Sequence, residues 1–206
     1  MFKHKLRSFS VAVGLITILS MMLGTPGVVI AAAPTGSSQN TNGILAISGS
    51  SSLGLATPSN LAFNSVSLNG SAQDVTNTEG SFNIDVTDAS GLAGGWNVTL
   101  VATTFTGTTQ ADHVLPDNTL SVSGLIANKL DSTSSMPVSS VNPSTTPVAI
   151  TTAASNPTPS EIYNAAPGTG MGNFELDTQL KLHLPADTIA DTYTSTITVA
   201  VASRMS

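Results

Sequence analysis

The 206-residue chain contains no cysteine. This absence excludes disulfides, thiolate metal sites, iron–sulfur clusters, cysteine nucleophiles and lipid attachment through an N-terminal cysteine. Charged residues make up only 9% of the chain and aromatic residues 4%, so its polarity comes from hydroxyl and amide side chains. This balance is typical of an extracellular β-protein rather than of a cytosolic enzyme.

Basic residues are also scarce, because six Lys and Arg stand against twelve Asp and Glu, for a formal net charge of −6. An acidic chain is poorly suited to binding phosphate backbones, so we expect no nucleic-acid partner. Three of the six basic residues lie at the N-terminus, and the remainder of the chain carries only Lys129, Lys181 and Arg204.

The N-terminus has the order of a secretory signal. Lys3, Lys5 and Arg7 precede an apolar stretch from Phe9 to Ile30, and Ala31–Ala33 supply small residues for cleavage. We therefore predict that residues 1–33 are a signal peptide and that the mature protein is secreted. An uncleaved membrane anchor is the alternative, which the glycines and the proline within the stretch disfavour as a helix.

The rest of the sequence predicts one domain without a membrane-spanning segment. Residues 34–42 are polar and indicate a flexible entry segment, and residues 43–206 form the expected β domain. Leu115–Thr119 and Leu184–Thr188 both depart from the sortase pattern Leu-Pro-x-Thr-Gly at its fourth and fifth positions. Any retention at the cell wall or cell surface is therefore expected to be non-covalent.

Apolar residues recur with a period of two along four segments, as in strands with one buried face. The residues that alternate define a predicted core of Phe82, Ile84, Trp96, Val98, Leu100, Leu180, Leu182, Tyr193, Ile197 and Val199. No stretch beyond the signal keeps a helical period over three turns. The sequence predicts an all-β fold, a single antiparallel β-sandwich or partly open barrel.

Weaker alternation predicts further strands at residues 44–47, 61–68, 119–126 and 148–153. Between residues 128 and 172 lies a long excursion rich in Pro, Ser and Thr, where only residues 148–153 look able to pair. Connections of this length carry function or stay mobile. We expect a loosely ordered excursion, with a recognition surface as the alternative.

One stretch resembles a known family. Residues 84–100 run from a strand ending in an aspartate, through a Gly-rich turn, into Trp96-Asn97-Val98. This stretch is similar to the first signature of the WxL-domain surface proteins of Gram-positive bacteria. Residues 170–201 resemble the closing segment of that family, but Val199-Ala200-Val201 stands where its second Trp-x-Leu is expected.

The resemblance implies non-covalent attachment to the Gram-positive cell wall, with peptidoglycan or another wall glycan as partner. The ligand-binding residues it implies are Asp88, Gly94, Gly95, Trp96, Asn97 and Val98. A tryptophan can stack on a sugar ring. However, Trp96 opens an alternating apolar run, which favours a core position, and wall binding would then use the surrounding loops.

The sequence carries no recognisable catalytic constellation, and we expect no enzyme, cofactor or metal. Asp85 and Asp88 point to opposite faces of an extended strand, so they cannot flank one glycosidic bond. Asp88 is interpreted as a turn residue, with a surface Ca²⁺ site as the alternative. His113 and His183, the two histidines beyond the signal, lie in unrelated segments.

Two function hypotheses follow. The first is a secreted, non-catalytic wall-binding protein. The second is a structural subunit of an extracellular fibre or matrix that assembles by β-strand addition, using an unpaired edge or the residues before Gly43 as donor strand. Other surface proteins, or further copies of the chain, are possible partners in either case.

Overall fold

Eleven strands build the structure, a computed structural model that describes residues 45–50 and 53–204. These residues belong to one unit, Leu45–Ser206. Every pairing between the strands is antiparallel, and the described part of the chain contains no helix. The predicted signal peptide, the flexible entry segment and the start of the domain at Gly43 all lie outside the described residues.

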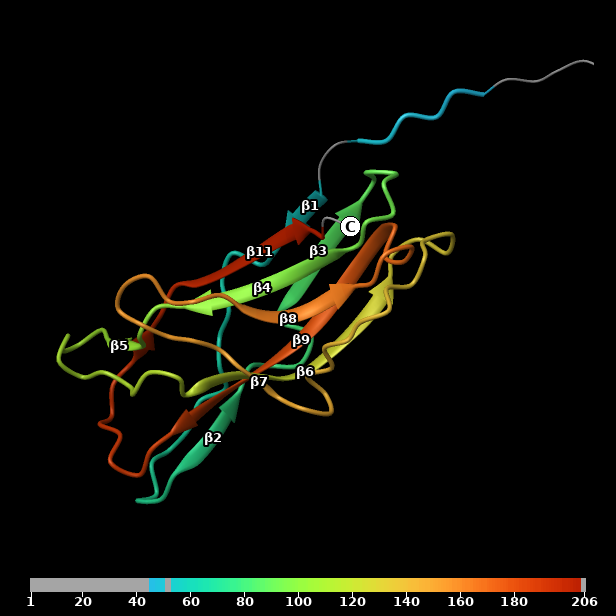
Figure 1. Cartoon of the computed structure of the whole chain (residues 1–206). Helices are drawn as coiled ribbons and strands as arrows, with labels where there is room; N and C mark the ends of the chain where they lie inside the picture. The colour runs from blue at the N-terminus through green and yellow to red at the C-terminus, as the bar shows by residue number, and fades with distance from the viewer. Residues whose placement is uncertain (1–44, 51–52, 205–206) are drawn as a thin grey trace, which may run out of the picture. The chain divides into compact units, whose positions relative to one another are not determined.

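The larger sheet has six strands around the long β9 (Figure 1). Its order is β1-β3-β9-β6-β7, and β2 also pairs with β9. The bounds are β1 Leu53–Ala56, β2 Gln73–Thr76, β3 Asn83–Asp88, β6 Leu120–Lys129, β7 Val148–Ala149 and β9 Gly172–Leu184.

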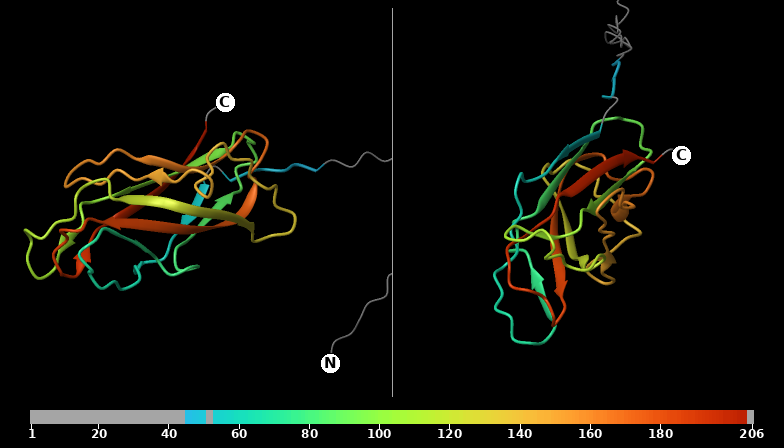
Figure 2. Two further views of the ribbon diagram at one scale, coloured as in Figure 1. Left: turned by 90° about the horizontal axis from the view of Figure 1, so that it is seen from below. Right: turned by 90° about the vertical axis from the view of Figure 1, so that its left-hand side faces the viewer.

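The second sheet has three strands in the order β11-β4-β8. They are β4 Trp96–Ala102, β8 Ser160–Ala165 and β11 Ile197–Ser203. A short ladder of β5 (Thr106–Gly107) and β10 (Tyr193–Thr194) continues beyond it. The two sheets form the layers of an open sandwich (Figure 2), so the predicted all-β fold is confirmed.

The core lies between the layers, because alternate residues of β3, β4 and β9 point inward. Ile84, Val98 and Leu180 have no exposed surface. Seven of the ten predicted core residues are buried, whereas Tyr193, Ile197 and Val199 are partly buried and pack against the cluster from its edge. Their position follows from β10 and β11, which lie at the margins of their sheets.

One edge of β9 is shared by β2 and β3, which follow one another along it. Asn77, only 1% exposed, fills the break between them. Its backbone N donates to Leu180 O, its side-chain oxygen accepts from Leu180 N at 2.7 Å, and its amide nitrogen donates to Thr178 O at 3.4 Å. A buried amide thus replaces the missing ladder contacts.

Three expectations from the sequence are wrong. Residues 45–47 of the predicted first strand form no strand. Residues 61–68 form none either, because Leu61 and Phe63 pack against the core while Val66 and Leu68 remain exposed.

The excursion is the third correction, because it is not loosely ordered. It supplies β8, whose residues 162–165 are buried beside β4. A bulge opposite Val98 and Thr99 leaves both Ile162 and Tyr163 facing the core and breaks the alternation that would have revealed the strand.

Candidate functional site

The turn between β3 and β4 begins with Asp88, whose side chain is buried at 4% exposure. Its Oδ1 accepts hydrogen bonds from the backbone N of Ser90 at 3.0 Å and from Ser90 Oγ at 2.6 Å. This is the local bonding by which aspartate shapes a turn. The predicted turn role of Asp88 is therefore confirmed.

Trp96 starts β4 and has no exposed surface. Its indole Nε1 donates to Gly170 O at 2.8 Å, and its ring lies beside Tyr163 and Phe174, with centroids 6.1 Å and 6.2 Å away. Both the apolar and the polar parts of the indole are thus satisfied inside the protein. The interpretation of Trp96 as a core residue is confirmed, and in this arrangement its ring offers no face to a sugar.

Glycines allow the backbone to approach this tryptophan closely. A Cβ at Gly170 would lie 2.8 Å from Trp96 Nε1, and Gly170 has a φ of +74°. Gly95 has a φ of +77°, and a Cβ there would clash with Ala165 O. Gly170 is therefore required by packing against the indole, and Gly95 by the close approach of the backbone at the end of β8.

The remaining signature residues also lie along this corner. Gly94 is half-buried, and a Cβ there would lie 2.9 Å from Arg204 O. Val98 is buried, while Asn97 is half-buried and its Nδ2 donates to Glu161 Oε2 at 3.3 Å. Val199, at the place of the second tryptophan, pairs with Leu100. A ligand-binding role for these residues stays a prediction.

Three loops meet at this end of the sandwich and are named here the end cap: residues 89–95, 132–140 and 166–171 (Figure 1). Backbone hydrogen bonds join them, from Gly168 N to Ala93 O at 2.8 Å and from Ala166 N to Val138 O at 2.9 Å. Ser135 exchanges bonds with Met171 and Gly170. The cap is thus a connected structure held from below by Trp96.

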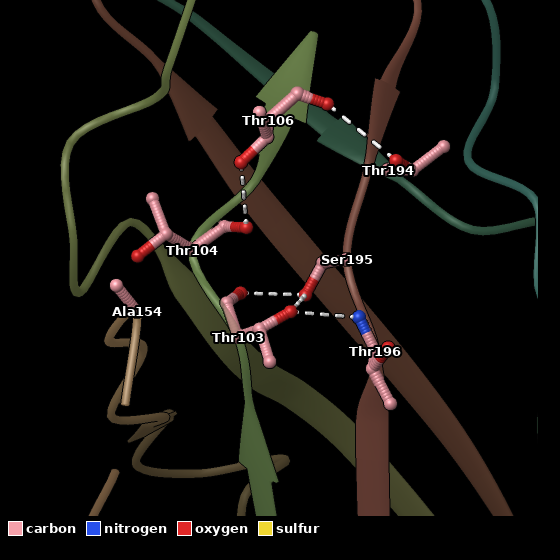
Figure 3. Close-up of a pocket in the computed structure, with 7 residues that line it drawn as sticks. All are labelled: Thr103, Thr104, Thr106, Ala154, Thr194, Ser195 and Thr196. Carbon is pink, nitrogen blue, oxygen red and sulfur yellow. Dashed lines mark hydrogen bonds between the residues drawn. The ribbon is translucent and has the colours of Figure 1, made fainter. Parts of the chain in front are cut away.

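A hollow of about 370 Å³ lies where β4 and β11 give way to β5 and β10, away from the end cap. All but one of the residues that line it carry a hydroxyl group, and the exception is an alanine: Thr103, Thr104, Thr106, Ala154, Thr194, Ser195 and Thr196 (Figure 3). Ser195 Oγ donates to Thr103 O, and Thr196 N donates to Thr103 Oγ1 at 2.9 Å. The lining is therefore uncharged and set in place by hydrogen bonds.

Four alternate threonines in and around β10 and β11, named here the threonine row, continue this surface. Thr192, Thr194, Thr196 and Thr198 are all exposed. The lone pairs of such hydroxyls can accept hydrogen bonds from a polar ligand. Sequence reasoning missed the hollow, because Thr103 and Thr196, which meet in its lining, are 93 positions apart.

A buried carboxylate beside the hollow was also missed. The Asp191 side chain has no exposed surface and accepts hydrogen bonds from the backbone N of Thr109 and of Thr192 and from His113 Nδ1 at 2.9 Å. Burial acts to raise the pKa of Asp191, but the hydrogen bonds from Thr109, His113 and Thr192 outweigh it and hold this pKa well below its ordinary value. Asp191 fastens the loop after β5.

Asp85 and Glu175 pair across β3 and β9 and line a second hollow together with Asn83. The two described histidines lie in separate places. His183 contacts Asp74 across the pairing of β2 with β9, whereas His113 contacts Asp191 between the loops that follow β5 and β9. Among residues 45–50 and 53–204, no group of three or more His, Asp or Glu is placed to hold a metal ion. No helix in the same residues is long and apolar enough to cross a membrane.

Comparison with known families agrees with the signature. The family model of the WxL domain, described as surface cell wall-binding, matches residues 26–203. The chain therefore belongs to the WxL domain family of surface cell wall-binding proteins. Comparison with curated proteins and with solved structures gives no match.

Proposed function

We propose that this protein is secreted and attaches non-covalently to the peptidoglycan of a Gram-positive cell wall, without catalysing a reaction. The observation that carries the proposal is the match of a cell wall-binding family model to residues 26–203. The signal-like N-terminus supports export. The mature chain would hold only three basic residues against twelve acidic ones, so attraction to anionic wall polymers would contribute little.

The signature residues Asp88, Gly94, Gly95, Trp96, Asn97 and Val98 are proposed to serve binding by building the corner of the sandwich. The burial of Trp96 and Val98 supports an indirect role, because neither side chain offers surface to a ligand. Loss of these residues would then abolish binding through loss of structure.

The hydroxyl-lined hollow and the threonine row are the proposed contact with wall sugar. Sugar hydroxyls both donate and accept hydrogen bonds, as do threonine and serine. The hollow carries no charged group in its lining, which suits a neutral glycan strand. Its hydroxyls are already oriented by contacts such as the one from Thr194 Oγ1 to Thr106 O at 3.5 Å.

The absence of a reaction is proposed on the family match and on the placement of two carboxylates, Asp88 beside the signature and Asp191 beside the hollow. Asp88 Oδ1 accepts hydrogen bonds within the turn at Ser90, and the carboxylate oxygens of Asp191 accept hydrogen bonds from the loop after β5. Neither carboxylate is presented beside a second one across an open cleft, as glycoside hydrolysis requires.

The structural-subunit alternative is retained because of β11. This strand lies at the edge of its sheet and reads Ile-Thr-Val-Ala-Val-Ala-Ser, with no charge and no proline. Charged residues and proline are the residues that commonly protect an edge strand against strand addition, and β11 has neither. Electron microscopy of the purified mature protein tests this alternative, since regular fibres would support it.

Co-sedimentation with purified cell walls tests attachment itself. We expect the mature protein in the wall pellet and an unrelated soluble control protein in the supernatant. A matched variant is Thr196→Val, which keeps the shape of the exposed side chain and removes its hydroxyl. Reduced pelleting of a folded Thr196→Val protein would support the hollow, and unchanged pelleting would place the contact elsewhere. Mass spectrometry of secreted protein tests removal of the predicted signal peptide, and a chain still beginning at Met1 would contradict that removal.

A further inference from the structure

The turn before β2 carries an asparagine followed by a glycine. Asn69, Gly70 and Ser71 are all exposed, and Gly70 has a φ of +77° with nothing within 4 Å of the position that a Cβ would occupy. Glycine adopts this conformation without strain. Among the described residues, no acceptor receives a hydrogen bond from Gly70 N. The turn therefore places an unhindered backbone nitrogen directly after an amide side chain.

The side chain of Asn69 is held against this backbone. Its Oδ1 accepts a hydrogen bond from Ser71 N at 2.9 Å, which is the bond of an Asx turn. A donor at this oxygen polarises the side-chain carbonyl and stabilises the negative charge that develops on the oxygen when a nucleophile attacks Cγ. The turn thus activates Asn69 Cγ toward the nitrogen of Gly70.

We infer that Asn69 is a site of spontaneous deamidation in the folded protein. The Gly70 nitrogen loses its proton and forms a bond to Asn69 Cγ, the bond from Cγ to Nδ2 breaks, and the proton leaves with the amino group as ammonia. Water then adds to one carbonyl carbon of the resulting cyclic imide and opens it to aspartate or isoaspartate. The net reaction converts an amide and water to a carboxylic acid and ammonia, without oxidation or reduction.

A second Asx turn contains the activated carbonyl without the nucleophile. Ser144 N donates to Asn142 Oδ1 at 3.1 Å, as Ser71 N does to Asn69 Oδ1. Pro143 follows Asn142, and its nitrogen has no proton to lose. We therefore expect Asn142 to remain an asparagine under conditions in which Asn69 reacts.

Asn64 provides the opposite comparison, because it is exposed and is followed by a residue with a backbone N–H, Ser65. Its amide is bonded to another segment: Nδ2 donates to Thr76 Oγ1 at 3.5 Å, and Oδ1 accepts from Thr78 Oγ1 at 3.2 Å. The nitrogen of Ser65 also lies next to a side chain, whereas that of Gly70 does not. We expect Asn64 to react more slowly than Asn69.

Peptide-resolved mass spectrometry of the mature protein, incubated in mildly alkaline buffer, tests this inference. We expect an amino group to be replaced by a hydroxyl at Asn69, with Asn142 unchanged and Asn64 slower. Asn42-Gly43 lies outside the described residues and is scored separately. The folded protein should react at Asn69 at least as fast as protein unfolded in urea, because the contact with Ser71 N belongs to the fold. An unmodified Asn69, slower reaction in the folded protein, or equal reaction at Asn64 would overturn the inference.

The matched variants are Gly70→Ala and Gly80→Ala. The two glycines have φ values of +77° and +69°, and neither has an atom within 4 Å of the added Cβ, so both substitutions strain an exposed turn alike. Gly70→Ala should slow the reaction at Asn69 about tenfold, because its methyl group hinders the attack. Gly80→Ala should leave the rate unchanged. An undiminished rate in Gly70→Ala, or equal slowing by both variants, would contradict attack by the nitrogen of residue 70. The inference is independent of wall attachment, because it uses neither the hollow nor the threonine row.

Discussion

The indole nitrogen of Trp96 donates a hydrogen bond to the backbone oxygen of Gly170 at 2.8 Å, across 74 positions of sequence. This bond ties the start of β4 to the loop before β9. It assigns the signature tryptophan to the support of the end cap, and it explains why glycine stands at position 170, where a Cβ would reach the same indole. The predictions below follow from this and related contacts.

Replacing Trp96 separates a structural role from a ligand-stacking role. Because the side chain is fully buried, Trp96→Ala should cost about 3–5 kcal/mol of unfolding free energy in chemical denaturation. Trp96→Phe, which keeps much of the apolar volume, should retain the fold and wall binding with a smaller loss. A Trp96→Ala protein of normal stability that no longer binds walls would show that the indole contacts the ligand.

Gly170→Ala should destabilise the protein through both strain and crowding. The residue has a φ of +74°, and its new Cβ would lie 2.8 Å from Trp96 Nε1 and 2.5 Å from Ala165 Cβ. Gly168→Ala is the matched control, because its φ is +79° but nothing lies within 4 Å of the added Cβ. Denaturation followed by the fluorescence of the single tryptophan should show the larger loss for Gly170→Ala. Equal losses would mean that crowding at the indole is unimportant.

Asn77→Ala should lower the unfolding free energy by about 1–3 kcal/mol, because Leu180 N would lose the oxygen that accepts its hydrogen bond at 2.7 Å inside the protein. Asn64→Ala removes an exposed amide nearby and should cost little. Urea denaturation of both variants measures the difference. An Asn77→Ala protein as stable as Asn64→Ala would mean that water replaces the amide.

The stability of the loop after β5 should depend on acid pH through Asp191. Its pKa is lower in the folded protein than the ordinary 3.8, so its contribution is present above that value and is lost as the pH falls toward the folded pKa. Asp191→Asn should therefore lower the melting temperature at neutral pH and reduce the difference between neutral and acid pH. Thermal melts across that range measure both, and a variant that loses stability to the same extent at every pH would contradict the assignment.

Alternation made part of this structure predictable from sequence. Strand β4 shows alternate burial from Trp96 to Ala102, so its inward face follows from the period alone. Strand β8 was not predictable, since its bulge buries consecutive residues and prolines flank it. The four-residue strands β1 and β2 exist through their pairing with β3 and β9 rather than through any local pattern.

Some parts of the candidate site were likewise predictable from sequence, and others were not. The family signature located Trp96, and alternation indicated its burial. The other parts of the site depend on contacts between segments distant in sequence. They are the bond from Trp96 to Gly170, the hydrogen bonds of Asp191 and the hollow at Thr103. Such contacts are set by how the two sheets stack, which no local spacing encodes.

Binding of the mature protein to peptidoglycan sacculi stripped of teichoic acids tests the central claim most directly. The bound fraction is measured by co-sedimentation as protein concentration and salt are varied. The account predicts saturable binding that salt does not weaken, because the proposed contact is uncharged. Protein that stays in the supernatant with stripped sacculi, or that salt releases from them, would contradict attachment to peptidoglycan through the hydroxyl-lined surface.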